Sequence, residues 1–337
     1  MPKRVLFFLI VPLLWTAGCE ILGKGGGYEC EPPPCPPNAN CLIRCGDLFI
    51  ANAEGGGALN LTHSVRGEGG PVWSPDGSEI AFIEEAGIGL WAISVMTRSG
   101  GNRRRLTKPG SYGNLTWSPD GARLAYNSDG VLHIINADGT GEKRLTTASH
   151  SLRPRWSPNG RQILFFSVIE GPWTLNVIDA DGTKERRLAP TLRNITTADW
   201  SPDGSRIAFS GNNKNEPSEI YIINVDGSGL TRVSKPGFSR RDPRWSPDGQ
   251  QIAYRGGGLW LMEADGSNRR VLVDGHIGEM DWSPNGKTLV YSSYQETGYA
   301  LYLFDIESQQ KRFLADVPTQ EYDLQWSPDG SWILFGG

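Results

Sequence analysis

Residues 200–209 read WSPDGSRIAF, and close variants of this stretch recur along the chain. The pentapeptide Trp-Ser-Pro-Asp/Asn-Gly occurs seven times, about 42 residues apart on average. Proline fixes φ at the first central position of a turn, Asp or Asn suits the second, and Gly accepts the left-handed conformation that follows. Each copy therefore predicts a tight corner between two strands. The tryptophans of the seven copies are Trp73, Trp117, Trp156, Trp200, Trp245, Trp282 and Trp326.

Apolar residues keep a fixed distance from each motif tryptophan. Ile or Leu stands seven residues after every one of them and Phe or Tyr nine residues after, as at Ile207 and Phe209. A two-residue spacing that is filled in all copies is typical of a strand. Two further apolar columns, which include Ile220 and Val233, indicate a third and a fourth strand. Each repeat thus predicts four short antiparallel strands, A to D, with the tryptophan at the end of strand A.

The order of the strands predicts how the repeats close. Four-stranded units that repeat every 40–45 residues are typical of a β-propeller. The chain enters with a C strand near Leu48 and a D strand near Leu61, and it ends with an A strand at Trp326 and a B strand at Ile333. We therefore predict an all-β fold over residues 47–337, a seven-bladed β-propeller of four-stranded antiparallel blades closed by a 2+2 blade from both termini.

The N-terminus carries the pattern of an export signal. Lys3 and Arg4 precede an apolar stretch, and Thr16-Ala17-Gly18-Cys19 follows it. This segment resembles the signal peptide of bacterial lipoproteins. The resemblance implies a signal peptide over residues 1–18 and a lipid anchor on Cys19, which would become the mature N-terminus. An ordinary secretory signal is the alternative.

Residues 19–46 are rich in Gly, Pro and Cys. Because such a composition cannot pack a core, it predicts a tether between the anchor and the propeller. An even set of cysteines besides Cys19, in an oxidising compartment, predicts two disulfides with the pairing left open. A zinc site is the alternative, but the spacing lacks the paired C-x-x-C knuckles that hold the ion. The candidates are Cys30, Cys35, Cys41 and Cys45.

Composition excludes several classes of protein. With 38% hydrophobic residues the chain can bury a core, and its net charge of −4 gives no general attraction to nucleic acid. Beyond the N-terminus no apolar run approaches the roughly 20 residues of a membrane-spanning helix. The Gly-x-Ser-x-Gly motif of serine hydrolases, the P-loop and the dinucleotide-binding fingerprint do not occur. We expect no nucleic-acid partner, no cofactor and no metal.

The WSPDG corner followed by Ile-Ala-Phe is similar to the repeats of TolB-like propellers, also called WD40-like (PD40) repeats, of bacterial periplasmic and surface proteins. The resemblance covers residues 47–337 and is more specific for fold than for function. Together with the predicted lipid anchor, it leads us to expect a lipid-anchored module at the outer membrane, the periplasmic face or the cell surface, which binds or scaffolds an unidentified envelope protein or glycan. The alternative is a polysaccharide lyase or hydrolase that uses the face formed by the D–A and B–C loops. We also expect a monomer.

One column near the expected channel is polar where a core would be apolar. The residue before the tryptophan is Arg, Asp, Arg and Asp in four consecutive repeats. Such a column predicts either ion pairs between blades or a ring that faces a ligand. We favour solvated loop positions over metal binding for the histidines of this face, and we assign no catalytic residue. The candidate channel face comprises Arg153, Arg155, Asp199, Arg240, Arg241, Arg244, Asp281, His150 and His276.

Overall fold

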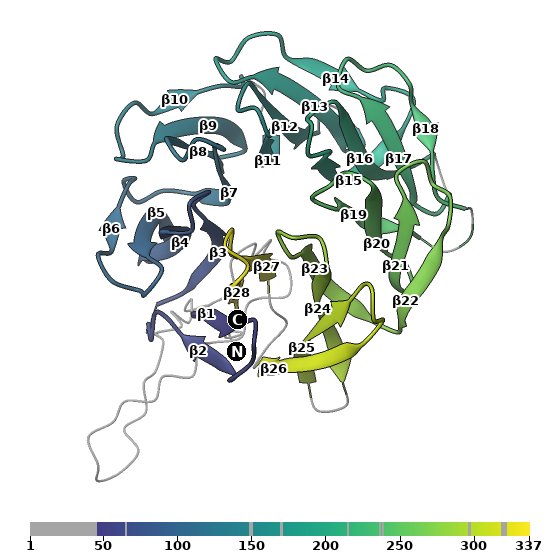
Figure 1. Ribbon diagram of the computed structural model, residues 1–337. Coiled ribbons are helices and arrows are strands. Elements are labelled where there is room, and N and C mark those ends of the chain that lie inside the picture. Colours follow the sequence, from purple (N-terminus) through teal and green to yellow (C-terminus); the bar gives the residue numbers. More distant parts are fainter. Residues whose placement is uncertain are drawn as a thin grey trace, which may run out of the picture. The chain divides into compact units, whose positions relative to one another are not determined.

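The computed structural model describes residues 46–64, 66–147, 151–168, 171–213, 216–235, 237, 239–295, 298–317 and 322–337. These residues form 28 strands in seven four-stranded antiparallel sheets, which Figure 1 shows as blades around a common axis. The predicted all-β, seven-bladed fold is confirmed. The predicted signal peptide, Cys19, the four disulfide candidates and nearly all of the tether lie outside the described residues. Within the described ranges, no helix is long and apolar enough to cross a membrane.

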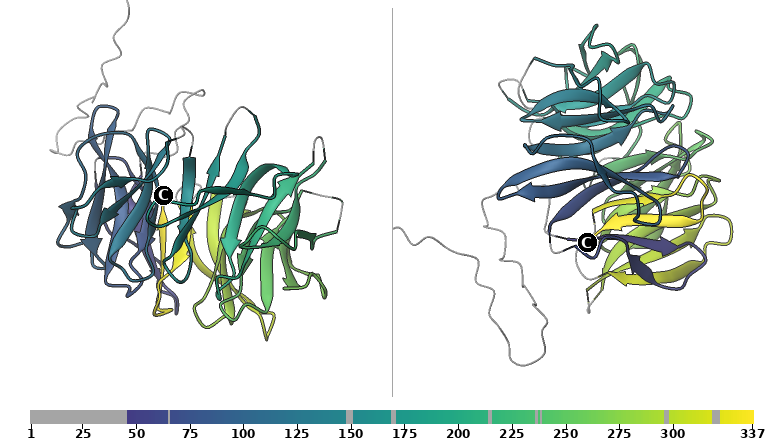
Figure 2. Two further views of the ribbon diagram at one scale, coloured as in Figure 1. Left: turned by 90° about the horizontal axis from the view of Figure 1, so that it is seen from above. Right: turned by 90° about the vertical axis from the view of Figure 1, so that its left-hand side faces the viewer.

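The A strand of each blade is the innermost, and it ends at a motif tryptophan as predicted. Figure 2 shows the ring from the side, with strands that run between its two faces. The A strands are β3 (Glu68–Trp73), β7 (Tyr112–Trp117), β11 (Ser151–Trp156), β15 (Arg193–Trp200), β19 (Arg241–Trp245), β23 (Ile277–Trp282) and β27 (Tyr322–Trp326). The B strands are β4 (Glu79–Gly87), β8 (Arg123–Ser128), β12 (Gln162–Ser167), β16 (Arg206–Asn212), β20 (Gln251–Arg255), β24 (Thr288–Gln295) and β28 (Trp332–Gly336).

The C and D strands complete the blades towards the outside of the ring. We number the blades 1 to 7 from β3 onwards, so that blade 7 contains β27, β28, β1 and β2. The C strands are β5 (Leu90–Thr97), β9 (Val131–Asn136), β13 (Thr174–Asp179), β17 (Glu219–Asn224), β21 (Gly258–Glu263), β25 (Gly298–Asp305) and β1 (Leu48–Asn52). The D strands are β6 (Arg104–Arg105), β10 (Lys143–Arg144), β14 (Arg186–Leu188), β18 (Thr231–Arg232), β22 (Arg270–Asp274), β26 (Lys311–Val317) and β2 (Ala58–Asn60).

Blade 7 is built from two distant parts of the chain. Its strand order is β2-β1-β28-β27, and β1 pairs antiparallel with β28 so that Leu48 lies opposite Gly336. The backbones of Asp47 and Gly337 add two hydrogen bonds of 3.0 and 3.1 Å. The predicted 2+2 closure is confirmed. It pairs strand edges that would otherwise remain open to association with another chain.

The core lies between neighbouring blades. The Phe or Tyr column of the B strands is at most 1% exposed in every blade, as Phe209 is. Trp156 packs with Ala125 and Leu132 of the preceding blade, and the other motif tryptophans are buried in the same way. Because each blade covers its neighbour, the apolar residues of the repeat become buried only when the ring assembles.

The corner motif folds as predicted. Ser201 Oγ donates to Asp203 Oδ1 at 2.6 Å and accepts from the backbone N–H of Arg206 at 2.9 Å. Gly204 has φ of 70°, and the motif glycines of all seven blades lie between 67° and 72°. A side chain is strained in this left-handed region, which explains the choice of glycine. The corners fix where each A strand ends and therefore which residues face the axis.

Candidate ligand-binding cluster at the axis

Two columns of the A strands are open to solvent at the axis of the ring. Counting back from each motif tryptophan, the tryptophan itself and the residue two before it are buried. The residues one and three before it are half-buried or exposed in every blade. The first column is Val72, Thr116, Arg155, Asp199, Arg244, Asp281 and Gln325. The second column is Gly70, Asn114, Arg153, Thr197, Asp242, Glu279 and Asp323.

A change of register separates these columns from the start of each A strand. The pairing between β27 and β28 shifts between Tyr322 and Gln325, and all six other A–B pairs also contain a shift. In five blades the residue of the second column has positive φ, for example 59° at Asp323 and 54° at Arg153. Such bulges bend a strand and re-aim its side chains. Here they place a second set of polar groups at the axis.

Asp199 and Asp281 bind the backbone of the next blade. Asp199 Oδ2 accepts from the backbone N–H of Trp245, and Asp281 Oδ2 accepts from that of Trp326, each at 2.9 Å. Arg155 Nη1 lies 3.7 Å from Asp199 Oδ1. Within the described part of this column, the alternation of Arg and Asp thus yields one direct ion pair. The aspartates hold the blades together chiefly through hydrogen bonds.

Arg244, Glu279 and Asp323 carry charge without a direct partner. None of these three side chains makes a hydrogen bond or an ion pair within 4.0 Å with another described residue. Asp242 differs, because the guanidinium of Arg255 bonds to its Oδ2 and neutralises it. The charges of Arg244, Glu279 and Asp323 are therefore available to a ligand.

Two axial carboxyl groups, those of Asp281 and Asp323, hold their protons more tightly than ordinary aspartates. Burial raises the pKa of Asp281 to about 6, although the hydrogen bond from the backbone N–H of Trp326 acts to lower this pKa. Burial also raises the pKa of Asp323 to about 6, and the carboxylate of Glu279 adds to the rise. Although water reaches Asp323, the surrounding blades displace much of the bulk solvent that would stabilise its charge. Both groups change charge close to neutral pH.

Neighbouring charges at the axis also shift the pKa values of Arg155 and Arg244. The positive charge of Arg244 lowers the pKa of Arg155 to about 10, with burial as the second cause. Burial by itself would lower the pKa of Arg244. The negative charges of Asp199 and Asp281 outweigh this effect, and the pKa of Arg244 is raised. Both groups remain cationic at neutral pH. We call Arg153, Arg155, Asp199, Arg244, Glu279, Asp281 and Asp323 the axial cluster.

The axial cluster has a positive side and a negative side. Arg153 and Arg155 belong to β11 in blade 3, whereas Glu279 and Asp323 belong to β23 and β27 in blades 6 and 7. Figure 1 shows β11 across the axis from β23 and β27. The arginines act on the pKa of Asp323 over this gap. A ligand that enters here meets opposite charges on opposite walls.

Three of the other predicted candidates, Arg240, Arg241 and His276, lie among the described residues but are not members of the axial cluster. Arg240 is 9% exposed, its guanidinium lies 4.5 Å from the ring centroid of Trp260, and it donates to the carbonyl of Gly256. Arg241 and His276 are exposed. His150 lies outside the described residues. The described residues contain no group of three His, Cys, Asp or Glu side chains that could hold a metal ion.

Sequence reasoning missed Glu279 and Asp323 as members of this cluster. The corner motif pointed to the column directly before each tryptophan, whereas the bulges that expose the second column leave no fixed pattern. A partial signal exists, because Gly, Asn and Asp tolerate left-handed backbone and occupy four of the seven positions three residues before the tryptophan. Arg153 also has left-handed backbone, although arginine does not favour this conformation, so its residue type gives no signal of the bulge.

The fold and the axial cluster define a closed β-propeller with a charged axis. Residues 44–201 match the family model described as the TolB beta propeller domain. A TolB homologue of Chlorobium chlorochromatii is 31% identical over 55% of this chain and 43% of its own length. The predicted resemblance to TolB-like propellers is confirmed.

One further relative and one solved structure show how widely this fold is used. Dipeptidyl-peptidase 5 of Porphyromonas gingivalis is 28% identical over 60% of this chain and 32% of its own length. The chain thus spans less than half the length of these curated relatives. The crystal structure of an oligogalacturonate lyase from Vibrio parahaemolyticus superposes with a TM-score of 0.70 at 11% identity, covering 87% of this chain and 98% of that one. At this identity the likeness shows the fold alone.

Proposed function

We propose that this chain is a binding module of the bacterial cell envelope, which takes a charged segment of a partner protein at the axial cluster. The observation that carries the proposal is the opposition of Arg153 and Arg155 to Glu279 and Asp323 across the axis. A polypeptide segment with charges of both signs complements these walls, and electrostatic complementarity selects partners. A neutral glycan would leave the charges unpaired in a partly desolvated site. A glycan is therefore the less favoured ligand.

An envelope location is supported by the predicted export signal and by the likeness to TolB relatives. We propose that Cys19 carries a lipid and that the following tether reaches from the membrane to the propeller. The Cys19→Ser variant should lose incorporation of an alkyne-tagged fatty acid and should move from the membrane fraction to the soluble fraction. Incorporation that persists in this variant would overturn the lipid anchor without touching the binding proposal.

A lyase or hydrolase of surface polysaccharide remains the alternative function. It has less support, because the two described histidines of the loop face, His63 and His276, belong to no group of metal-ligating side chains among the described residues. His63 and His276 are exposed, and they belong to blades 7 and 5 and the loops that follow them. Release of unsaturated or reducing sugars from the producing organism's own surface polysaccharide by the purified chain would favour this alternative.

Site-directed photocrosslinking in the producing cells tests the binding proposal. A photoreactive benzoylphenylalanine replaces Thr116, which faces the axis outside the axial cluster, or, as the control, the exposed Thr231 on β18. The proposal predicts a discrete protein adduct from position 116 that position 231 does not give. The same adduct from both positions, or none from position 116, would contradict it.

A further inference from the structure

A cation lies on the motif tryptophan at two blade interfaces. The guanidinium carbon of Arg123 in blade 2 is 4.8 Å from the ring centroid of Trp156 in blade 3. That of Arg206 in blade 4 is 4.7 Å from Trp245 in blade 5. Contacts of this kind between a cation and an aromatic face are favourable. Both arginines are the first residue of their B strand, six positions after the motif tryptophan of their own blade.

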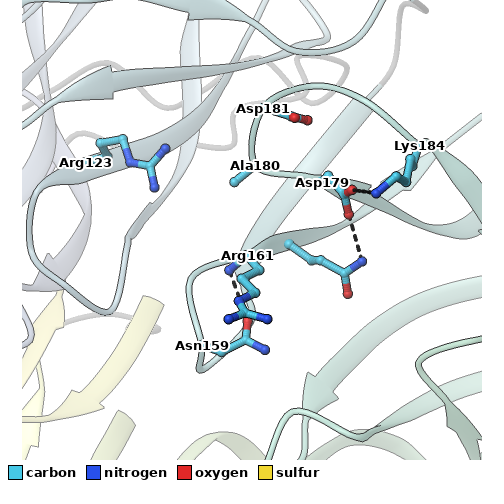
Figure 3. Close-up of a pocket in the computed structure, with 8 residues that line it drawn as sticks. Arg123, Asn159, Arg161, Asp179, Ala180, Asp181 and Lys184 are labelled. Carbon is cyan, nitrogen blue, oxygen red and sulfur yellow. Dashed lines mark hydrogen bonds and ion pairs between the residues drawn. The ribbon is translucent and has the colours of Figure 1, made fainter.

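Figure 3 shows one of these interfaces. Arg123 extends from blade 2 towards the turn of blade 3 that contains Asp179 and Asp181. In that turn Asp179 already binds Lys184, with 3.1 Å between Oδ2 and Nζ. The chain thus supplies both the cation that covers the tryptophan and acidic residues beside it.

At the interface between blades 6 and 7 the covering cation is missing. The equivalent first residue of β24 is Thr288, whose side chain is the shortest at this position and carries no charge. A cavity of about 470 Å³ lies there, lined by Thr288 and Trp326 among others. Trp326 is 9% exposed, more than Trp245 at 5%. The other residues at the position of Thr288 are Glu79, Arg123, Gln162, Arg206, Gln251 and Trp332.

The lining of this cavity is acidic. Glu54, Asp305 and Asp329 contribute carboxylates, and Arg312 is the one cationic residue among the lining side chains. Arg312 already donates to the backbone carbonyls of Ala53 and Glu54.

The aspartates of the cavity stay ionised. Hydrogen bonds from the backbone and the hydroxyl of Ser308, both to Oδ1 at 2.7 Å, lower the pKa of Asp305. They leave Asp305 Oδ2 free of a described partner. Asp329 Oδ2 accepts from Arg98 at 2.9 Å, so that it is partly compensated. Glu54 and Asp305 therefore leave the cavity negative.

We propose that this cavity binds a guanidinium group, as an arginine side chain of a partner polypeptide presents it. The group would lie over Trp326 as Arg206 lies over Trp245, and Asp305 would accept its N–H donors. The planar fork of a guanidinium suits a carboxylate beside an aromatic face better than an ammonium does. The partner would thus supply from outside the contact that the chain makes for itself at two other interfaces.

Titration with N-acetyl-arginine amide tests this site in the full chain. The readout is the indole N–H resonance of Trp326, assigned through Trp326→Phe. The arginine probe should shift this resonance saturably, whereas the neutral isostere N-acetyl-citrulline amide should not. Asp305→Asn should weaken the affinity at least about threefold, because one charged acceptor is lost. Equal shifts with both probes, or none with arginine, would overturn the proposal.

Two substitutions use the other interfaces as a template. Thr288→Arg should cover Trp326 from within and abolish binding of the probe. Arg206→Thr should open a space over Trp245 and add a second saturable shift at the indole of Trp245, weaker than the first because Asn224 stands opposite residue 206 where Asp305 stands opposite Thr288. Undiminished binding by Thr288→Arg contradicts the proposal. If that variant does not fold, Arg206→Thr and Asp305→Asn decide the question, because unchanged behaviour of both contradicts it equally. These positions lie outside the axial cluster, so a negative result leaves the proposed function intact.

Discussion

Asp281 Oδ2 accepts a hydrogen bond of 2.9 Å from the backbone N–H of Trp326 and so joins blade 6 to blade 7. The carboxyl group faces the axis and holds the neighbouring strand through its main chain. This relationship shows how the axial residues combine two tasks. A residue that faces the axis, where a ligand would enter, can also be part of the joint between blades.

The bond predicts a difference between two substitutions of Asp281. Asn retains an oxygen that can accept the N–H of Trp326, whereas Ala leaves that N–H without an acceptor. We expect Asp281→Asn to be more stable than Asp281→Ala by about 1–2 kcal/mol, the cost of an unsatisfied buried donor. Chemical denaturation at pH 7.5 measures both values. Equal stabilities would show that this bond does not hold the blades.

The raised pKa values predict how stability depends on pH. Asp281 and Asp323 titrate near pH 6 in the folded chain and near 3.8 when unfolded. Between these values the folded state binds more protons, so the free energy of unfolding should rise as the pH falls from 7 towards 5. The double variant Asp281→Asn, Asp323→Asn should lose most of this slope. Denaturation curves at several pH values test it, and an unchanged slope would argue against the assignment.

A second electrostatic prediction concerns blade 1. Glu68 and Glu84 are 1% and 7% exposed, and Arg103 bonds to both of them. Arg103→Met should lower the free energy of unfolding by about 3–5 kcal/mol, because it leaves the buried carboxylate of Glu68 without its cation, while Glu84 keeps its ion pair with Arg105. Arg98→Met is the matched control, since Arg98 and Asp329 form an ion pair that is 47% exposed on each side. The control should cost at most about 1 kcal/mol.

The corner glycines give a prediction about backbone strain. A Cβ added to Gly204 would lie 3.6 Å from Pro158 Cδ, an ordinary contact, while its φ of 70° disfavours a side chain. Gly204→Ala should therefore cost about 1–2 kcal/mol through strain alone. Gly204→Asn should cost less, because Asn tolerates this region. A larger loss for Asn than for Ala would point to crowding instead.

The fold could be predicted from the repeat, because the residue types of the repeat indicate turns and strands over short stretches of sequence. A turn glycine such as Gly204 and a strand pair such as Ile207 and Phe209 carry information within ten residues. Seven copies then fix the blade count, and the incomplete ends fix the closure. The site was less predictable, since it depends on contacts between blades. Nothing near Arg240 in the sequence reveals that its guanidinium packs on Trp260.

The same reasoning explains the acidic members of the axial cluster. Glu279 and Asp323 both face the axis only because a bulge in each A strand turns the second column towards it. A bulge reflects how two strands pair, and that pairing is set by the assembled ring. The sequence alone does not mark Thr288 as unusual. Its lack of a charge becomes informative only when the structure shows that Arg123 and Arg206, at the same position in other blades, lie over tryptophans.

The central claim is that the axial cluster binds a charged protein segment, and Arg244 tests it most directly. Its side chain has no direct partner among the described residues, so Arg244→Gln should alter the melting temperature by less than about 2 °C. Crosslinking from position 116 in producing cells should, however, fall at least about tenfold in this variant. An unchanged adduct would contradict the account, and so would a large fall in melting temperature, because Arg244 would then be a structural residue.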